Sequence, residues 1–262
     1  MNTHPGTGPT EEAVPLSGRT VLVAGAGSAS GTAVCRALDA AGARVVAVGR
    51  VATRLENTLS GLEHVDLRTC NLDHAGQVAA LASDMQETYG GVDGIIHLVG
   101  GWRSGNGIAS QAEADWDFLE TNILRTLRNV SRSFYDQLED SACGRLAIVS
   151  STAVDSPTAA GAGYAAAKAA AEAWVRAVAQ GFRRDQSGRK DYPKAQHSAA
   201  VVFVVKALVD EDQRRAAPER KFPGFTDVSD LAAAAVRIFS QDAAEINGER
   251  IYLTAGKQAS GQ

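Results

Sequence analysis

The segment from Arg19 to Gly42 constrains the fold more than any other part of this chain. An apolar run with β-branched side chains, Arg19 to Ala24, leads directly into the glycine-containing turn Gly25-Ala-Gly-Ser-Ala-Ser-Gly31. A helical pattern follows and stops at Gly42. Strand, glycine turn and helix in this order favour a dinucleotide site, because glycines let the backbone approach a pyrophosphate at the helix N-terminus. An ordinary strand-to-helix turn is the alternative.

The same alternation of strand and helix continues along the chain. Further strands are predicted at residues 44–50, 64–68, 92–99, 145–151, 199–205 and 249–253. Helices are predicted at about residues 74–89, 111–138 and 160–182, and from a cap at Asp227 or Ser229 to about residue 239. Alternating strands and helices favour one parallel sheet covered by helices on both faces, so the predicted fold class is α/β.

Polar segments mark the remaining boundaries. Residues 1–15 are rich in Pro, Gly, Thr and Glu and are predicted to be a disordered leader. The single predicted domain is residues 16–262. Within it, residues 183–197 are predicted to form an exposed loop, and residues 210–225 a charged loop that covers the substrate.

Composition excludes several classes of protein. The net charge of −4 offers no basic surface for nucleic acid, and no apolar run is long enough for a membrane span. The N-terminus lacks a signal-peptide core. The three cysteines, Cys35, Cys70 and Cys143, are odd in number and widely spaced, so we expect buried thiols and neither disulfides nor a metal site. We therefore expect a cytoplasmic protein with a small-molecule partner.

A second pattern concerns proton chemistry. Tyr164 and Lys168 stand four residues apart at the start of an alanine-rich segment, so a helix would place them on one face. A nearby cation favours the phenolate and lowers the pKa of a tyrosine from its usual value of ~10. Such a tyrosine can exchange a proton with an alcohol or carbonyl oxygen, which Ser151 at the end of the preceding strand would hold. By itself the pair also describes a solvated helix face.

The residues after the second strand bear on the choice of cofactor. An acidic residue there would bind a ribose 2′-hydroxyl and indicate NAD. Gly49 and Arg50 occupy this place, with Arg54 one turn further on, and a guanidinium suits a 2′-phosphate. The pattern favours NADP(H) over NAD(H), although a plain surface arginine would look the same.

Asn122 lies inside the predicted helix 111–138. An asparagine in the middle of a helix competes for backbone hydrogen bonds, so this one predicts a local bulge beside the site or a merely exposed side chain. The turn Gly100-Gly101-Trp102 follows the fourth strand, at the sheet edge where ligands bind in doubly wound folds.

Together these motifs resemble the short-chain dehydrogenase/reductase family over about residues 16–256. The matching motifs are Gly25-x5-Gly31, the turn at residues 97–100, Asn122, Ser151 and Tyr164-x3-Lys168. The resemblance implies a Rossmann fold with a seven-stranded parallel sheet in the order 3-2-1-4-5-6-7. It also implies a homodimer or homotetramer built on the helices at 111–138 and 160–182.

The resemblance assigns roles to four catalytic candidates. Tyr164 would be the acid/base, and Ser151 would orient the substrate oxygen. Lys168 would bind the nicotinamide ribose and lower the tyrosine pKa, while Asn122 would hold a water that relays protons. The candidates for cofactor binding are Gly25, Gly27, Ser28, Ala29, Ser30, Gly31, Arg50, Asn71, Leu72, Val99, Gly100, Gly101, Tyr164, Lys168 and Val205.

Several positions depart from the family's pattern. The family usually has Asn-Asn-Ala-Gly where this chain has His97-Leu-Val-Gly100, and an Asp that meets the adenine where this chain has Asn71. A Pro-Gly that lines the nicotinamide is replaced by the run Val205-Lys-Ala-Leu208, and Ser28 stands where NADP-preferring members often carry a basic residue. The Gly-Gly-Trp turn is similar to that of dihydropteridine reductases, which generally lack a serine at the position of Ser151.

Two functions compete. The first is an NAD(P)(H)-dependent oxidoreductase that interconverts a carbonyl and an alcohol on a small or medium-sized, mostly apolar or cyclic substrate. Small residues from Ala159 to Gly163 leave room near Tyr164, and Trp102 and Phe222 are the candidate substrate contacts besides Ser151. Trp102 is equally expected to stack on the substrate or to pack the covering loop. The second function is a nucleotide-binding sensor or scaffold without turnover, which the lost Pro-Gly and the altered turn favour.

Overall fold

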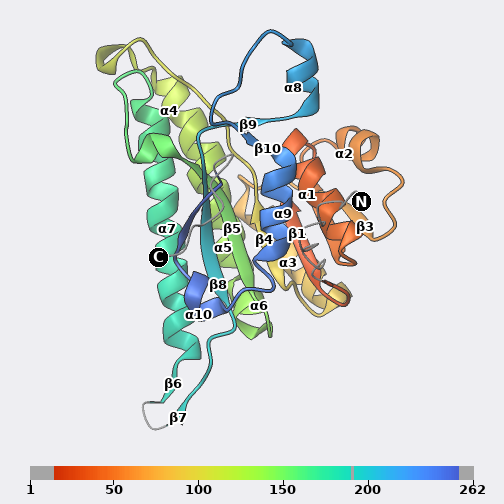
Figure 1. The fold of residues 1–262 in the computed structure, drawn as a ribbon. Coiled ribbons are helices and arrows are strands. Elements are labelled where there is room, and N and C mark those ends of the chain that lie inside the picture. Colours follow the sequence, from red (N-terminus) through yellow and green to blue (C-terminus); the bar gives the residue numbers. More distant parts are fainter. Residues whose placement is uncertain (1–14, 190–191, 254–262) are drawn as a thin grey trace, which may run out of the picture.

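A seven-stranded parallel sheet forms the centre of the protein in the computed structural model, which describes residues 15–189 and 192–253 (Figure 1). The order of its strands is β11-β8-β5-β4-β1-β2-β3. The strands are β1 (Thr20–Ala24), β2 (Arg44–Gly49), β3 (Val65–Thr69), β4 (Gly94–His97), β5 (Arg145–Ser151), β8 (Ala199–Val205) and β11 (Arg250–Tyr252). Counted within the sheet this is 3-2-1-4-5-6-7, so the predicted fold and strand order are confirmed.

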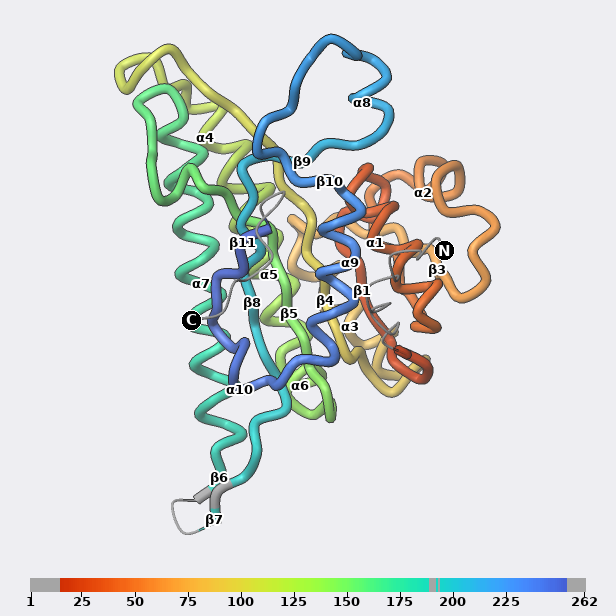
Figure 2. The backbone as a smooth tube through the Cα atoms, viewed as in Figure 1, coloured from red at the N-terminus to blue at the C-terminus, as the bar shows by residue number. Residues whose placement is uncertain are grey.

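Helices cover both faces of the sheet (Figures 1 and 2). One face packs against α1 (Ala29–Ala40), α2 (Ala52–Leu59), α9 (Val228–Arg237) and α10 (Ala243–Ile246). The other packs against α3 (Ala75–Tyr89), α4 (Glu113–Leu119), α5 (Thr126–Ser133), α6 (Tyr135–Asp140) and α7 (Ala162–Gln186). In the described part of the chain, no helix combines the length and apolar character that crossing a membrane requires.

Burial on both faces explains why the strands are apolar without alternation. All seven residues of β8 are buried. Val202 and Val204 point into the core beneath α7, whereas Val201 and Phe203 point into the core beneath α9. Successive side chains of a strand point to opposite faces, so a sheet with two covered faces selects apolar residues at every position.

Local signals set several helix boundaries. The Ser28 side chain accepts a hydrogen bond from the Gly31 amide and caps α1. The Asp227 carboxylate accepts from the Ser229 amide and caps α9, which resolves the two predicted caps in favour of Asp227. Gly90 ends α3 in the left-handed conformation, with φ of 76°.

Three predicted segments differ from the structure. The helix at 111–138 is interrupted, because a π-helical turn, η2 (Glu120–Arg125), separates α4 from α5 and a break at Phe134 separates α5 from α6. The predicted loop at 183–197 is wrong at its start, since α7 continues to Gln186, whose buried amide bonds Ser198 and the Glu139 carbonyl. The burial of Gln186 was not predicted, because the residues directly before it are charged.

The predicted loop at 210–225 contains a short helix, α8 (Glu211–Ala216), which Asp210 caps. It follows β9 (Leu208–Val209), which pairs with β10 (Thr226–Asp227). Figure 2 shows the α8 segment projecting from the same end of the molecule as the chain before α4. The opposite end carries the small antiparallel pair β6 (Gly188–Arg189) and β7 (Tyr192–Pro193). Of the predicted leader, residues 1–14 lie outside the described residues.

Hydrogen bonds of Arg145 connect the amino-terminal end of β5 to the end of α9. Its guanidinium is 3% exposed and donates hydrogen bonds of 2.8 to 2.9 Å to the carbonyls of Gly144, His197, Ile238 and Gln241. In a variant without the guanidinium, the carbonyls of His197, Ile238 and Gln241 would lose this donor, whereas the Gly144 carbonyl would keep the Ala199 amide.

We expect Arg145→Met to lower the free energy of unfolding by about 3 kcal/mol, because buried carbonyls without donors are costly. Urea denaturation measures this loss. The exposed Arg132→Met is the control and should change stability by less than about 0.5 kcal/mol. Equal stability of the two variants would contradict the structural role of Arg145.

Candidate active site

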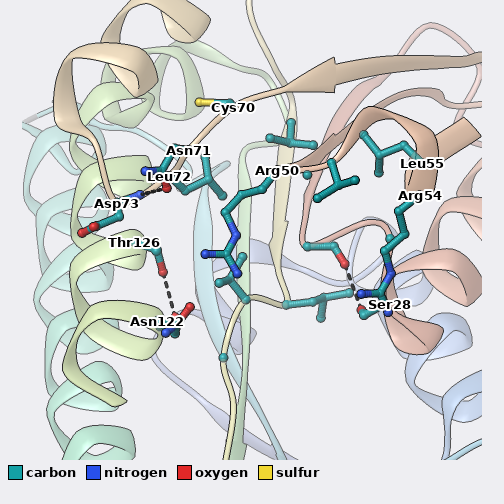
Figure 3. Close-up of a pocket in the computed structure, with 18 of the residues that line it drawn as sticks. Ser28, Arg50, Arg54, Leu55, Cys70, Asn71, Leu72, Asp73, Asn122 and Thr126 are labelled. Atoms are coloured by element: carbon teal, nitrogen blue, oxygen red, sulfur yellow. Dashed lines mark hydrogen bonds between the residues drawn. The ribbon is translucent and has the colours of Figure 1, made fainter. Parts of the chain in front are cut away.

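A cleft of about 380 Å³ opens at the carboxyl ends of the strands, where the strand order reverses between β1 and β4 (Figure 3). In doubly wound sheets this is the place where ligands bind. The predicted cofactor residues that line it are Gly25, Gly27, Ser28, Arg50, Asn71, Leu72, Val99 and Gly100. Asn122 lines it as well. Lining residues that the sequence analysis did not assign to the site include Val48, Gly49, Val51, Leu55, Cys70, Asp73, Leu98, Thr121 and Thr126.

The glycine turn after β1 forms one wall of the cleft. Gly25 has φ of +86°, a conformation that favours glycine. A Cβ on Gly31 would lie 2.3 Å from the Gly25 carbonyl oxygen, so only glycine lets the start of α1 pack onto this turn. The cleft lining does not include three of the predicted cofactor residues, Ala29, Ser30 and Gly31. They form the first turn of α1. The N-terminus of α1 thus faces the cleft beside Gly27 and Ser28.

Two arginines stand at the rim beyond β2. Arg50 follows β2 directly and extends into the cleft between Leu72 and Ser28, as Figure 3 shows. Arg54, on α2, reaches toward the glycine turn, where its Cγ would be 3.3 Å from a Cβ on Gly27. The ion pairs among the described residues include neither guanidinium. Both cations are therefore available to an anionic group of a ligand.

The structure brings Ser151, Tyr164 and Lys168 together at the same edge of the sheet. Ser151 ends β5 and is 5% exposed, and its hydroxyl accepts a hydrogen bond from the Ala153 amide at the start of the 3₁₀ turn η3 (Thr152–Val154). Tyr164 lies in the first turn of α7, and Lys168 follows one turn later. The Lys168 ammonium lies 5.8 Å from the centre of the Tyr164 ring and donates to the Val149 carbonyl at 2.8 Å.

The titration behaviour of this group differs from the prediction. Burial raises the pKa of Tyr164, and a hydrogen bond with Ser151 partly offsets this effect. Lys168, whose ammonium donates to Val149, is not among the groups that shift the phenol pKa. Burial instead lowers the pKa of Lys168 itself to about 8, and the nearby Glu172 carboxylate opposes that shift. The expectation of a tyrosine pKa lowered by the lysine is therefore wrong for this arrangement.

Asn122 lies in the π-helical turn η2, so the predicted bulge is present. Its side-chain amide donates to the Phe118 carbonyl at 2.8 Å, and its backbone carbonyl accepts from the Thr126 hydroxyl at 2.9 Å. Figure 3 shows Asn122 and Thr126 on the wall of the cleft that faces Arg50. An asparagine inside an apolar helical pattern was the only sequence signal for this irregular turn.

A buried network beside Ser151 was not foreseen. The Glu172 carboxylate is 3% exposed, accepts from the Ser150 hydroxyl at 2.6 Å and pairs with the Arg250 guanidinium at 3.0 Å. Arg250 also pairs with Asp155 at 2.6 Å, and the Tyr252 hydroxyl donates to Asp155 at 3.0 Å. The one sequence signal for this network was the spacing of Glu172, four residues after Lys168 on the same predicted helix face. Nothing in the sequence links β11 to this site.

The predicted substrate contacts are dispersed. Trp102 is 64% exposed, whereas Gly101 packs so closely on the Phe118 ring that a Cβ would lie 2.5 Å from it. The Arg103 guanidinium stacks on the Phe118 ring, 3.6 Å from its centre. Gly101 therefore shapes the turn and is not among the lining residues of the cleft.

Phe222 packs against Phe225 with the ring centres 5.5 Å apart, and Arg220 stacks on both rings. Phe222 lies between α8 and β10 and is not among the lining residues of the cleft. Val205 ends β8 and is 4% exposed, paired in register with Ser151. It too lies outside the cleft lining and supports the strand end that carries Ser151.

Comparison with known proteins identifies the family. The profile of the family "short chain dehydrogenase" matches residues 19–186, which include the glycine turn, Asn122, Ser151 and the Tyr164–Lys168 pair. The chain therefore belongs to the short-chain dehydrogenase/reductase family and is an NAD(P)-dependent oxidoreductase.

Relatives and solved structures agree with this assignment. An uncharacterized oxidoreductase of Staphylococcus aureus (strain MW2) is 30% identical over 173 residues, which cover 65% of this chain and 72% of that protein. Nodulation protein G of Rhizobium meliloti (strain 1021) is 28% identical over 250 residues, covering 92% of this chain and 97% of that protein.

Two solved structures share the fold. A metagenomic short-chain oxidoreductase in complex with NADP superposes with a TM-score of 0.72 at 22% identity, covering 91% of this chain and 97% of the other. An NADPH-bound short-chain oxidoreductase from Pseudomonas aeruginosa PAO1 with an atypical catalytic center has a TM-score of 0.79 at 21% identity, covering 94% and 99%.

The buried lysine makes stability depend on pH. Between about pH 8 and 10.5 the unfolded chain holds a proton on Lys168 that the folded chain has released. Stability contributed through this group therefore rises with pH across that window. We expect the free energy of unfolding of the wild type to rise by about 3 kcal/mol relative to that of Lys168→Met from pH 8 to 10.5 in urea titrations. A constant difference would mean that Lys168 is not desolvated.

Proposed function

We propose that this protein is an NADP(H)-dependent short-chain oxidoreductase that interconverts a ketone and a secondary alcohol, with Tyr164 as the acid/base. One observation carries the proposal: Ser151, Tyr164 and Lys168 converge at the sheet edge, and Asn122 lines the cleft at that edge. A phenol, a hydroxyl, an ammonium and an amide at such an edge supply proton transfer and orientation.

The residues that line the cleft suit a dinucleotide. The close approach of Gly31 to the Gly25 carbonyl leaves the start of α1 free of side-chain bulk, which suits a pyrophosphate at the helix N-terminus. The loop after β3, with Asn71 and Leu72, would hold the adenine side, and Gly100 lies between the cleft and the Lys168 ammonium. The bound cofactor supplies or accepts the hydride, and the protein contributes position and proton transfer.

The raised pKa of Tyr164 suits a proton donor. At neutral pH the buried phenol keeps its proton, which it can give to the oxygen of a carbonyl as that oxygen gains negative charge. The Ser151 hydroxyl beside it would hold the same oxygen. Lys168, with a pKa of about 8, is mostly charged at neutral pH and would bind the ribose next to the nicotinamide.

The arginines at the rim favour NADP(H). The chain after β2 has no carboxylate for a ribose 2′-hydroxyl at Gly49 and Arg50, and the Arg50 side chain extends into the cleft. Arg54 lies near enough to the glycine turn to share a 2′-phosphate. The structural relatives with NADP or NADPH bound are consistent with this preference.

A mostly apolar substrate suits the surfaces near Tyr164. The exposed apolar side chains in the segment before and within α4 are Trp102, Ile108 and Trp116. Gln111 ties this segment to the small-residue loop before α7 through the carbonyls of Ala159 and Ala160. The two segments together would form the entrance for a ketone or alcohol without a large charge.

Titration with NADPH and NADH tests the cofactor assignment. We expect Arg50→Ala and Arg54→Ala each to weaken NADPH binding about tenfold, because each removes a charged partner of the 2′-phosphate, and to change NADH binding less than about twofold. Quenching of the three tryptophans reports binding. Arg132→Ala is the control. Tighter binding of NADH by the wild type would reject the role of the arginines.

Tyr164→Phe tests the acid/base assignment. We expect it to lower kcat at least about a hundredfold in a ketone or alcohol screen, while the Kd for NADPH changes less than about twofold, because the phenol proton is needed only in the chemical step. Tyr192→Phe, exposed at the far end of the molecule, is the control. Activity that survives in Tyr164→Phe would overturn the assignment, and cofactor binding without any turnover by the wild type would support the sensor.

A further inference from the structure

His97 is a buried polar residue that the proposed chemistry does not use. It is the last residue of β4, is 3% exposed, and pairs in register with Ala24 of β1 and Ile148 of β5. It therefore stands at the carboxyl edge of the sheet, on the strand that leads into Gly100. In the motif described above the family usually has an asparagine here.

The hydrogen bonds of its neighbours determine the tautomer of His97. The Thr126 hydroxyl has one proton, which it donates to the Asn122 carbonyl at 2.9 Å. At its contact with His97 Nε2, 3.2 Å away, Thr126 Oγ1 must therefore accept. Nε2 carries the proton, and Nδ1 is left with a lone pair. Burial and the neighbouring Lys168 cation lower the pKa of His97 to about 3, which is consistent with a neutral ring.

The Nδ1 atom is buried and has no hydrogen-bond partner among the described residues. A buried acceptor without a donor is costly, so its surroundings should supply one. Lys168 has three ammonium protons, and the Val149 carbonyl takes one of them. The ammonium lies 3.6 Å from where a Cβ on Gly100 would be, three residues after His97. Lys168 is near enough to His97 to lower its pKa, and a buried acceptor near such a donor is a setting in which one water bridges the two groups.

We propose that His97 is a positioning residue for the proton-transfer site. Its Nε2–H holds Thr126 and, through Thr126, the π-helical turn that carries Asn122. Its Nδ1 accepts a hydrogen bond from a water shared with Lys168. One side chain thus joins the turn after β4 to two of the catalytic candidates. The inference rests on the proposed function in that these candidates serve proton transfer.

The imidazole suits this task better than an amide. Through its two ring nitrogens, one side chain can donate to Thr126 of α5 from Nε2 and keep Nδ1 as an acceptor at the same time. Because the ring stays neutral, it adds no second positive charge next to Lys168. His97 is therefore expected to hold groups in place and not to exchange protons itself.

A measurement without turnover tests the tautomer. In protein labelled with ¹⁵N-histidine, the signal of His97 among the five histidines is identified by its loss in His97→Gln. We expect Nε2 protonated and Nδ1 bare from about pH 5 to 8, with no titration step, and a shifted Nε2 resonance in Thr126→Val. A proton on Nδ1, or titration near the ordinary pKa of ~6.5, would overturn the proposal.

Kinetics test the positioning role. His97→Leu removes both contacts and should lower kcat about a hundredfold, whereas His97→Gln, whose amide N–H imitates Nε2–H, should lower it about tenfold. The Kd for NADPH should change less than about twofold in both. His64→Gln, at a solvent-exposed histidine, is the matched control. Unchanged kcat in both His97 variants, or losses confined to the Kd, would overturn the proposal.

The two measurements separate the possible failures. If the wild type turns over no substrate, the proposed function fails, but the tautomer of His97 is still read directly by NMR. If His97→Leu does not fold, His97→Gln and Thr126→Val still report on the two halves of the contact. A crystal structure with an ordered water between His97 Nδ1 and Lys168 Nζ would support the bridging role, and direct contact of Nδ1 with another protein group would contradict it.

Discussion

The burial of the Lys168 ammonium is the constraint on which the rest of the site depends. Only 8% of this residue is exposed, and an unpaired buried charge is costly. Three elements reduce that cost: the Val149 carbonyl at the end of β5 accepts one hydrogen bond, the Glu172 carboxylate lies one turn later on α7, and the neighbouring His97 stays neutral. The carboxylate in turn needs Ser150 and Arg250, so the last strand of the sheet also stabilises the site.

The same edge of the sheet separates two tasks. On the side of β1 and β2, the glycine backbone leaves space for a dinucleotide, and two arginines that form no ion pair among the described residues supply positive charge. On the side of β5 and α7, burial raises the pKa of Tyr164 and lowers the pKa of Lys168. Asn122 lies in the π-helical turn η2 and lines the cleft. Binding and proton transfer thus meet at the point where the strand order reverses.

Much of the fold was predictable because apolar runs and helical periodicity are local properties. Strand positions, the glycine turn and the irregularity at Asn122 follow from patterns within short segments, whereas the order of the strands came from the family resemblance. The end of α7 was missed because Gln186 is polar yet buried through hydrogen bonds to residues far along the chain. The pKa of Tyr164 was predicted with the wrong sign because spacing shows which residues share a helix face, but not how deeply they are buried or where the ammonium is directed.

The sequence by itself determined the α/β class, the family and the set of polar residues available for chemistry, because these depend on residue types and spacings along the chain. Only the tertiary structure decided how those residues act on one another. Arg250 reaches Glu172 across 78 positions of the chain, and His97 reaches Thr126 across 29. Hydrogen-bond partners, burial and the resulting pKa shifts depend on which strands lie side by side. That adjacency is set by the packing of the whole sheet and not by any one segment.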